Sequence, residues 1–431
     1  MGGHSVRSGL RRKPAAIESI VVICPGDRLC RGMTTDIIMP LYDIAISGAG
    51  PVGSALALLL AERAPHPERI AVLARGITAK GGDAKETGQT RPAARRTADP
   101  RTLALNHGSR MLLEKIGAWP GKSAEITTVH VSQRSRLGRT LIRHDELGVP
   151  RLGNVAAYDD VLACLHAALR QCGVTLLEAP AGGSSGDNAS HGRVELPDTD
   201  SRLFVRSDGA RATGIERQYG QDALLATVRA SRPRAGWAYE RFTRQGPLAF
   251  LPHPDGADLY GVVWCNPPAR AAHLQALDDA AFEASLGEAF GDRLGDLHVL
   301  GPRHVFPLSM HAGPSLLGQR AIAIGNAAQT LHPVAGQGLN LGLRDAAQLA
   351  IALGPWLAQP DSDPTHLLAD FARRRRPDRL LTGGVTDFLP RIFATGNPLV
   401  EHAGGLALLA LDVLPGLRRP LARHLLQGLR T

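Results

Sequence analysis

Apolar and polar residues follow two different rhythms along this chain of 431 residues. In the first, apolar residues recur at every second position, as in half-buried strands, through residues 126–131, 246–251 and 259–264. In the second, they recur every three to four positions in residues 281–291 and 338–352, which predicts helices. Strands and helices mixed along one chain predict an α/β fold.

A strand, a glycine-rich turn and a helix follow one another near the start of the chain. Residues 43–47 are typical of a short strand, and residues 54–62 form an Ala/Leu-rich segment typical of a helix. Between them, Gly48, Gly50 and Gly53 match the pattern G-x-G-x-x-G. The first glycine permits a tight turn, the second lets backbone approach a pyrophosphate, and the third lets the helix pack closely on the strand. This context predicts dinucleotide binding.

The acidic residue that usually completes this pattern is absent. It is expected about 20 residues further on, at the end of the second strand. That strand is predicted over residues 69–73, and the position is taken by Arg75. An arginine here could accommodate the 2′-phosphate of NADP, or it could lie along the adenine or ribose of FAD. The glycine motif alone does not decide between the two.

A second glycine-rich segment, residues 320–346, reads RAIAIGNAAQTLHPVAGQGLNLGLRDA. It predicts an apolar strand, a tight turn, a Pro/Gly loop and a helix. The N–H groups at such a helix start and the positive end of its dipole stabilise negative charge. A reduced flavin, anionic on its pyrimidine edge, needs such a site. Taken alone, the segment could also be an ordinary connection between a helix and a strand.

Two further segments lie between these glycine-rich stretches. Asp99, Pro100 and Arg101 open a run with helical apolar spacing through residue 119, which predicts a helix beginning at these residues. Alone, this run reads as a plain amphipathic helix with a charged entry. Residues 203–213 predict a strand that ends in Asp208-Gly209, a pair usually found in simple turns.

The order of these motifs resembles the class A flavoprotein aromatic hydroxylases, the group that includes para-hydroxybenzoate hydroxylase. The narrower likeness is to the ubiquinone-biosynthesis hydroxylases that act on polyprenylated phenols. Residues 99–119, 218–252 and 325–345 carry that narrower match, and the likeness runs from about residue 43 to the C-terminus.

The resemblance implies a Rossmann-like FAD-binding domain of the GR2 type, with an inserted mixed β-sheet substrate domain and a C-terminal helical segment. Residues 1–40 are expected to be a disordered extension or the result of a misassigned start. We expect the FAD domain at 41–125, 151–216 and 302–380, the substrate domain at 126–150 and 217–301, and C-terminal helices at 381–431.

The resemblance also implies roles for individual residues. The first glycine turn would hold the FAD pyrophosphate, and Arg101 would reach the phosphate or ribityl chain from the helix that it opens. Asp208 and Gly209 match a motif associated with both FAD and NAD(P)H. Tyr219, Gln221, Arg241 and Phe242 belong to a motif at the start of the substrate sheet. The implied cofactor-binding residues are Gly48, Gly50, Gly53, Arg75, Arg101, Asp208, Gly209, Gly325, Asn326, Gly336, Gln337, Gly338, Leu339 and Asn340.

The implied chemistry is hydroxylation of an aromatic ring. NAD(P)H would reduce FAD, oxygen would form a C4a-hydroperoxide on the flavin, and its distal oxygen would attack the ring. Pro333, Val334 and Gly336 would form the wall that keeps this intermediate dry. His332 could carry a proton, or it could be a structural histidine before a proline. No metal is required.

This chain departs from the family pattern at two positions. The family turn is Gly-Asp, whereas this chain has Gly325-Asn326. Asparagine keeps one carbonyl acceptor and adds an NH2 donor, so we expect to lose about one hydrogen bond to the ribityl chain, on the order of 0.5–1.5 kcal/mol. Together with Arg75, this leaves open a weakly FAD-binding, non-catalytic member of a ubiquinone-synthesis complex. A hydroxylase of another aromatic substrate is the alternative enzyme.

Composition narrows the partners. The chain has 49 Lys and Arg against 40 Asp and Glu, a net charge of +9, but aromatics are only 4% and no basic run is interleaved with them, so nucleic acid is not expected. A basic surface that faces anionic lipid fits better. Five irregularly spaced cysteines predict no disulfide framework and favour a cytoplasmic protein.

The C-terminal tail is both apolar and basic. Residues 406–411 are apolar and are followed by Arg418, Arg419, Arg423 and Arg430. Such a tail could lie on the inner membrane surface, lie against a partner, or pack as an ordinary terminal helix. The sequence contains no run of 18 or more apolar residues, so no membrane span is predicted.

Overall fold

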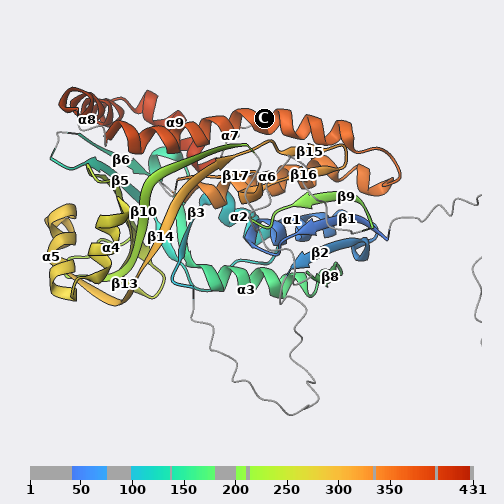
Figure 1. Cartoon of the computed structure of the whole chain (residues 1–431), viewed down its shortest axis with the longest axis horizontal. Helices are drawn as coiled ribbons and strands as arrows, with labels where there is room; N and C mark the ends of the chain where they lie inside the picture. The colour runs from blue at the N-terminus through green and yellow to red at the C-terminus, as the bar shows by residue number, and fades with distance from the viewer. Residues whose placement is uncertain are drawn as a thin grey trace, which may run out of the picture. The chain divides into compact units, whose positions relative to one another are not determined.

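The computed structural model describes residues 41–74, 99–135, 138–179, 200–209, 214–332, 336–393 and 397–427 (Figure 1). These residues belong to a single unit that spans Pro40–Thr431. The predictions made for residues 1–40, Arg75, Pro333 and Val334 lie outside the described residues.

A six-stranded sheet forms around the first glycine turn. Its order is β15-β16-β9-β1-β2-β8, and all neighbours are parallel except β15 and β16. The central strand, β1, reads as an unbroken buried run because helices and neighbouring strands cover it. The sheet contains the strands predicted at residues 43–47, 69–73 and 203–208. Its strands are β1 (Tyr42–Ser47), β2 (Ile70–Ala74), β8 (Thr175–Glu178), β9 (Ser201–Arg206), β15 (Leu316–Gly318) and β16 (Ala321–Ala323).

Helices α1 (Pro51–Ala61), α3 (Tyr158–Leu169) and α6 (Gln337–Leu353) pack with this sheet in one hydrophobic core. Helix α1 is apolar on all sides and is buried from Gly53 to Leu60. Helix α6 lies against α1, and it matches the helix predicted at 338–352. The two glycine-rich segments of the sequence therefore meet in space.

An eight-stranded sheet has the order β17-β14-β10-β13-β12-β11-β5-β6, antiparallel except for β11 and β5. Helices α4 (Pro268–Ala276) and α5 (Asp279–Phe290) pack in its core, where Trp264, Phe250 and Phe282 are buried. The alternating patterns predicted at 246–251 and 259–264 are strands of this sheet. Its strands are β5 (Thr128–Gln133), β6 (Arg139–Arg143), β10 (Ile215–Ala230), β11 (Trp237–Phe242), β12 (Pro247–His253), β13 (Gly256–Asn266), β14 (Leu297–Ala312) and β17 (Gln329–Thr330).

Strands β10 and β14 are the long ribbons of this sheet, shown in green and orange in Figure 1. Strand β10 has a bulge between Gln218 and Asp222, where Gly220 takes a φ of 62°. The predicted domain boundary at 301/302 falls inside β14, so the domain division stays a prediction.

A third sheet, of three strands, includes part of the segment that was predicted to be a helix from residue 99. Residues Thr102–Asn106 form strand β3, between Arg101 and helix α2 (His107–Lys115), so the helix prediction was wrong for this stretch. Strand β3 pairs with β7 (Gly153–Ala157), which also pairs with β4 (Ala124–Ile126). The helix starts only at residue 107 because the Asn106 side chain accepts a hydrogen bond from Ser109 N–H and caps it.

Three helices end the described chain: α7 (Thr365–Phe393), α8 (Pro398–Val413) and α9 (Pro415–Gln427). The predicted C-terminal helical segment is therefore present, although α7 begins before residue 381. No helix in the described ranges is long and apolar enough to cross a bilayer. Single 3-10 turns are η1 (Pro67–Arg69), η2 (Asp145–Leu147), η3 (Asp292–Leu294), η4 (Gly325–Ala327) and η6 (Trp356–Ala358).

Candidate active site

The first glycine turn is tight at both ends and open in the middle. Gly48 has a φ of 98°, and a Cβ there would lie 2.5 Å from Asp208 Cα. A Cβ on Gly53 would lie 2.1 Å from the Gly48 carbonyl oxygen. At Gly50, by contrast, a Cβ would meet nothing within 4 Å. Only glycine fits the two tight positions, whereas the middle position leaves backbone accessible to a ligand.

The start of α1 can bind an anion. Its N-cap residue is Gly50, no side chain caps it, and no acidic residue lies in the first turn. The first backbone N–H groups of a helix have no partner within the helix, and they add to the positive end of its dipole. This geometry suits a phosphate or pyrophosphate group.

Two side chains hold the Ala49 carbonyl within this turn. Ser54 Oγ donates to it at 3.0 Å, and His166 Nε2, from helix α3, lies 2.8 Å from it. Because a carbonyl only accepts, His166 carries a proton on Nε2. Sequence reasoning missed His166, since nothing in its local pattern places α3 beside a turn more than a hundred residues earlier.

Asp208 lies at the carboxyl ends of β1 and β9. Ser47 Oγ donates to Asp208 Oδ2 at 2.8 Å, and Arg206 Nε lies 3.4 Å from Asp208 Oδ1. Ser207 Oγ donates to the Gly48 carbonyl at 3.1 Å and so links this segment to the glycine turn. Gly209 has a φ of 74° and open space around it. The predicted Asp-Gly pair thus lies directly beside the first glycine turn.

The second glycine-rich segment packs against the first at Val52. A Cβ on Gly325, whose φ is 60°, would lie 3.1 Å from Val52 Cγ1. A Cβ on Gly342 would lie 2.7 Å from Val52 Cγ2 and 3.2 Å from Gly325 Cα. The neighbouring Asn326 is exposed, and Gly338 is open like Gly50. The second glycine-rich segment therefore packs on the first turn of α1 through Gly325 and Gly342, although the two segments lie far apart in the sequence.

Asn340 positions the start of α6 on strand β3. Its amide donates to the carbonyls of Ala104 at 2.9 Å and Gly336 at 2.7 Å, and its carbonyl accepts from Asn106 N–H at 2.9 Å. The side chain is 1% exposed. It holds Gly336 in a left-handed conformation at the N-cap of a helix that has no side-chain cap. Asn340 thus shapes the site through backbone contacts.

The other predicted residues of the α6 start differ in exposure. Gln337 is 5% exposed, whereas Leu339 is half-buried and packs against the core around β1. No side chain caps the N-terminus of α6.

Arg101 is held by neighbouring side chains. Its Nη2 lies 2.5 Å from Asp99 Oδ2, and its guanidinium carbon lies 4.3 Å from the centre of the Tyr158 ring. The hydrogen bond to Asp99 raises the pKa of Arg101, and that to Arg101 lowers the pKa of Asp99. The predicted contact of Arg101 with the FAD phosphate stays a prediction.

His332 packs against strand β10 of the eight-stranded sheet. It is 1% exposed, its Nε2 lies 3.3 Å from Gln221 Oε1, and the Tyr219 ring meets it edge-on at 4.7 Å. Burial lowers the pKa of His332 to about 4, so the ring is neutral near pH 7. Tyr219 Oη in turn lies 3.2 Å from Met310 Sδ, and burial raises the pKa of Tyr219.

The other two residues of the predicted substrate-sheet motif are packed inside. Arg241 Nε donates to the Ala289 carbonyl at 3.0 Å, and burial lowers the pKa of Arg241 to about 10. Phe242 stacks on Phe393 of α7 with ring centres 4.4 Å apart. Phe242 therefore joins the sheet to the C-terminal helices.

A buried ion cluster fixes α6 to α7. Arg375 Nε lies 2.7 Å from Asp345 Oδ1, and Arg375 Nη2 lies 2.5 Å from Asp378 Oδ2. His424 Nε2, from α9, lies 3.7 Å from Asp378 Oδ1. Burial raises the pKa of Asp345 and lowers that of His424. Sequence reasoning missed this cluster because the run at 373–376 reads as a solvated surface.

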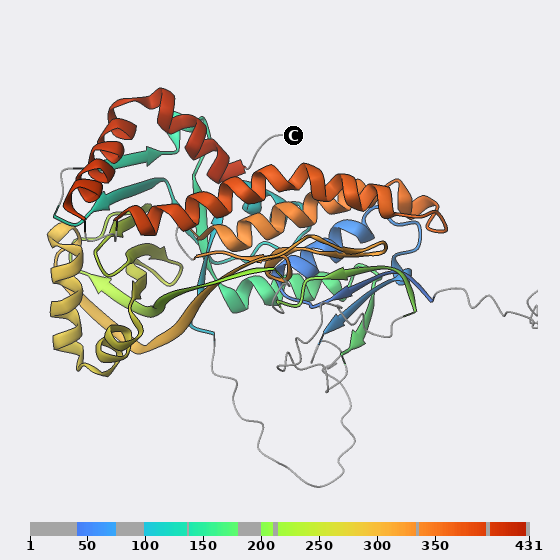
Figure 2. The same ribbon diagram turned by 45° about the horizontal axis from the view of Figure 1, so that its top comes forward.

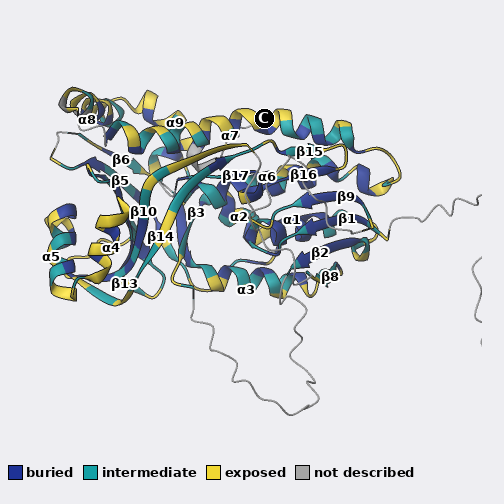
Figure 3. Cartoon of the chain, in the orientation of Figure 1, coloured by how far each residue is buried: buried dark blue, intermediate teal, exposed yellow. Residues whose placement is uncertain are grey.

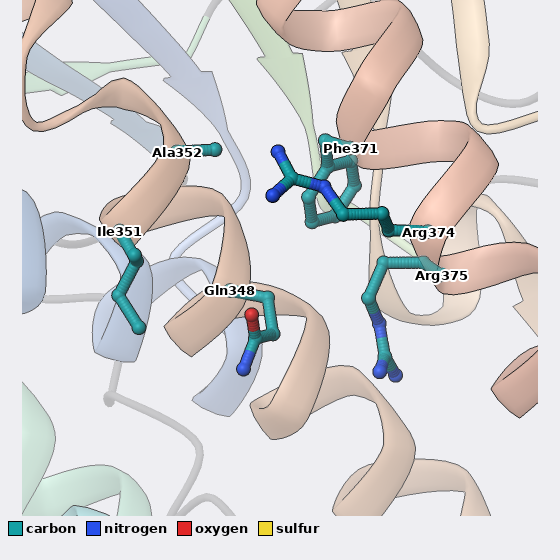
Figure 4. A pocket seen from close by; sticks show the side chains of 6 residues that line it. All are labelled: Gln348, Ile351, Ala352, Phe371, Arg374 and Arg375. Carbon is teal, nitrogen blue, oxygen red and sulfur yellow. The ribbon is translucent and has the colours of Figure 1, made fainter. Parts of the chain in front are cut away.

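Figure 4 shows the small cavity beside this cluster, between α6 and α7. Its volume of about 40 Å³ is too small for an aromatic substrate or a flavin. No group of His, Cys, Asp or Glu in the described part of the chain could hold a metal. The two uncapped helix starts and the open backbone at Gly50 and Gly338 are features that fit a large anionic cofactor.

Comparisons with known proteins agree with this geometry. Residues 209–381 match the model of an FAD binding domain. The chain is 31% identical to the ubiquinone hydroxylase UbiL of Rhodospirillum rubrum, with 93% of this chain and 92% of that protein covered. It is 27% identical to the 3-demethoxyubiquinol 3-hydroxylase of Escherichia coli, with 89% and 98% covered.

A solved structure shows the same fold. The p-nitrophenol 4-monooxygenase PnpA of Pseudomonas putida superposes with a TM-score of 0.63 at 16% identity, covering 91% of this chain and 99% of that chain. The predicted α/β fold and the cofactor FAD are thus confirmed. The chain belongs to the family of FAD-dependent monooxygenases that includes the ubiquinone hydroxylases.

Proposed function

We propose that this enzyme hydroxylates the aromatic ring of a polyprenylated phenol in ubiquinone biosynthesis, with NAD(P)H as reductant and molecular oxygen as co-substrate. The observation that carries the proposal is the packing of α6 on the first turn of α1. Gly325 and Gly342 meet Val52 there, and the backbone at Gly50 and Gly338, at the two uncapped helix starts, has open space around it. The relatives named as ubiquinone hydroxylases supply the substrate class.

Within this proposal, the chain's residues bind and orient the cofactor. The open backbone at Gly50 and the start of α1 hold the pyrophosphate. Gly325 and Asn326 would bind the ribityl chain, and the first turn of α6, from Gly336 to Leu339, would bind the ring system. When bound and reduced, FAD supplies the activation of oxygen.

The remaining groups shape the substrate side. Gly336 would belong to the wall that excludes water, together with Pro333 and Val334, which lie outside the described residues. His332 fits a positioning role, because its buried neutral ring donates to Gln221 of the substrate sheet. This favours the structural alternative over a proton carrier.

The test starts with the colour of the purified protein. A yellow protein that absorbs near roughly 450 nm, as protein-bound oxidised flavins do, contains FAD. Such a protein should oxidise NAD(P)H with a prenylated phenol and yield a product that is heavier by one oxygen atom. A deletion strain should lose ubiquinone and accumulate a prenylated intermediate. An FAD-loaded protein that does neither contradicts the proposal.

A second candidate function is a weakly FAD-binding, non-catalytic member of a ubiquinone-synthesis complex. The observation that favours it is Asn326, which is exposed next to the turn at Gly325, at a position where the family has an aspartate. A colourless protein that restores ubiquinone in the deletion strain through complex formation supports this alternative.

A further inference from the structure

Helix α8 displays apolar side chains to solvent along one stripe. Leu399 is 80% exposed, Leu406 64% and Val413 66%. These residues are seven positions apart, so they lie on nearly the same side of the helix. Single exposed apolar residues are common, but an aliphatic stripe four turns long is not.

The opposite side of α8 holds the helix firmly on the protein. Leu408 is 4% exposed and lies in a core cluster with Phe242 and Phe393. A Cβ on Gly138 would lie 2.2 Å from the Gly405 carbonyl oxygen, so α8 also contacts the start of β6 closely. Asp412 Oδ1 accepts from Leu141 N–H at 3.0 Å. The exposed stripe is therefore displayed by an anchored helix.

The apolar region continues onto both neighbouring helices, which contact α8 or adjoin it. Figure 3 shows exposed residues along the upper edge, where α7, α8 and α9 lie. We call the outer faces of these helices the helical ridge. Besides the α8 stripe, its exposed apolar residues are Leu380, Leu381 and Phe388 on α7, Leu409 on α8, and Leu414 and Leu417 at the start of α9.

Arginines accompany this apolar surface. The exposed ones are Arg373, Arg374, Arg376 and Arg391 on α7, and Arg419 and Arg423 on α9. Nearby acids are largely engaged: Asp370 Oδ1 lies 2.7 Å from Arg373, and Asp387 lies 3.0 Å from both Arg217 and Arg391. The ridge thus combines aliphatic side chains with a positive charge.

We propose that the helical ridge is the docking surface for an anionic lipid bilayer. The leucines and valine enter the boundary between headgroups and acyl chains, and the arginines bind lipid phosphates. A protein partner fits less well, because stable protein interfaces are rich in aromatic anchors and this ridge displays a single one, Phe388, among the described side chains.

The ridge is rigidly tied to the cofactor helix. Arg375 of α7 binds Asp345 of α6, and His424 brings α9 to the same cluster. Docking would therefore hold the start of α6 in a fixed position relative to the bilayer. The reason for such docking rests on the proposed function, because a polyprenylated phenol dissolves in lipid.

The test uses the full-length, FAD-loaded protein and vesicles of phosphatidylcholine, with and without phosphatidylglycerol. The wild type should co-sediment with the phosphatidylglycerol vesicles and be released by salt. The combined variant Leu399→Asp, Leu406→Asp and Val413→Asp should bind at least roughly tenfold more weakly. The matched control Leu41→Asp changes a 62%-exposed leucine directly before β1 and should bind as the wild type does.

Charge is tested separately. The pair Arg419→Glu and Arg423→Glu should lower binding several-fold, whereas Arg270→Glu, an exposed arginine on α4, should not. Melting temperature and bound FAD show whether each variant is folded. Should the aspartate variant misfold, Leu406→Trp provides a second measurement: its fluorescence should be quenched by brominated phosphatidylglycerol.

Three outcomes overturn the proposal: a wild type that ignores anionic vesicles, a folded aspartate variant that binds them equally well, or a stable protein oligomer through these residues without vesicle binding. Vesicle binding needs no substrate. A protein that docks but does not hydroxylate prenylated phenols therefore contradicts only the proposed function, and an active enzyme that never docks contradicts only this inference.

Discussion

Helices α1 and α8 are built from nearly the same residues and end in opposite environments. Both are rich in alanine and leucine, as PVGSALALLLA in α1 and GGLALLAL in α8 show. In α1, Leu56 to Leu60 are at most 5% exposed, because the six-stranded sheet, α3 and α6 surround the helix. In α8, the helix is covered where it faces β5, β6, α7 and α9, and Leu399, Leu406 and Val413 are exposed.

The comparison shows that an apolar helix does not encode its own burial. The two helices differ in how many elements from other parts of the chain pack against them. The buried helix carries the first glycine turn at its start, and the half-covered helix carries the exposed apolar stripe. The following predictions test this contrast, from the largest expected effect to the smallest.

Substitutions of two adjacent arginines on α7 should show the largest difference in the free energy of unfolding. Arg375→Met removes the partner of buried Asp345 and one of the two arginines at Asp378, and leaving a buried charge unpaired costs about 3–5 kcal/mol. Arg376→Met, at an exposed position, should change the free energy of unfolding by less than about 0.5 kcal/mol. Urea unfolding of both variants measures the difference. Equal losses would mean that the ion cluster is misplaced.

Leucine truncation compares the two helices directly. Leu59→Ala in α1, where the side chain is 2% exposed, should lower the free energy of unfolding by about 2–5 kcal/mol. Leu406→Ala in α8, where it is 64% exposed, should stay within about 0.5 kcal/mol. Thermal and urea unfolding provide the measurement. A large loss at Leu406 would show that its outer face is covered by the protein itself.

The buried histidine on the cofactor side should make stability depend on pH. Burial lowers the pKa of His332 to about 4, below its unfolded value, so the unfolded state binds the proton first as pH falls. Stability should therefore fall between about pH 6.5 and 4, by up to about 1.4 kcal/mol per pH unit for this group.

The variant His332→Gln keeps a donor toward Gln221. It should remove the contribution of His332 to the dependence of the free energy of unfolding on pH. Burial also lowers the pKa of His130 to about 4, and the contribution of His130 to this pH dependence should remain in the variant. Urea unfolding at several pH values measures both. An unchanged slope in the variant would show that His332 is accessible to water.

Asn326→Asp should give the smallest effect. Restoring the family's carboxylate at this exposed position should tighten FAD binding by on the order of 0.5–1.5 kcal/mol, through one hydrogen bond to the ribityl chain. Fluorescence titration of the apoprotein with FAD measures the change. Unchanged affinity would mean that this side chain does not face the ribityl chain.

Several elements of the cofactor side could be predicted because their constraints are local. The turn at Gly48 needs a positive φ, and Gly53 has no room for a Cβ, so residue type alone identifies the turn. The prediction of a helix at residues 99–106 was wrong for the opposite reason. The apolar spacing was helical, but Leu105 faces the core from a strand that pairs with β7. Pairing with a distant strand overrode the local pattern.

The sequence by itself determined the two glycine turns and the strand and helix beside each, because backbone conformation and steric room depend on adjacent residues. The class of cofactor followed from the order of the motifs and the family that this order resembles. Tertiary structure alone decided that His166 holds the Ala49 carbonyl, that Asn340 binds β3, and that α8 keeps one side bare. These outcomes depend on groups that lie far apart in the chain, and burial is a property of the space that such groups fill together.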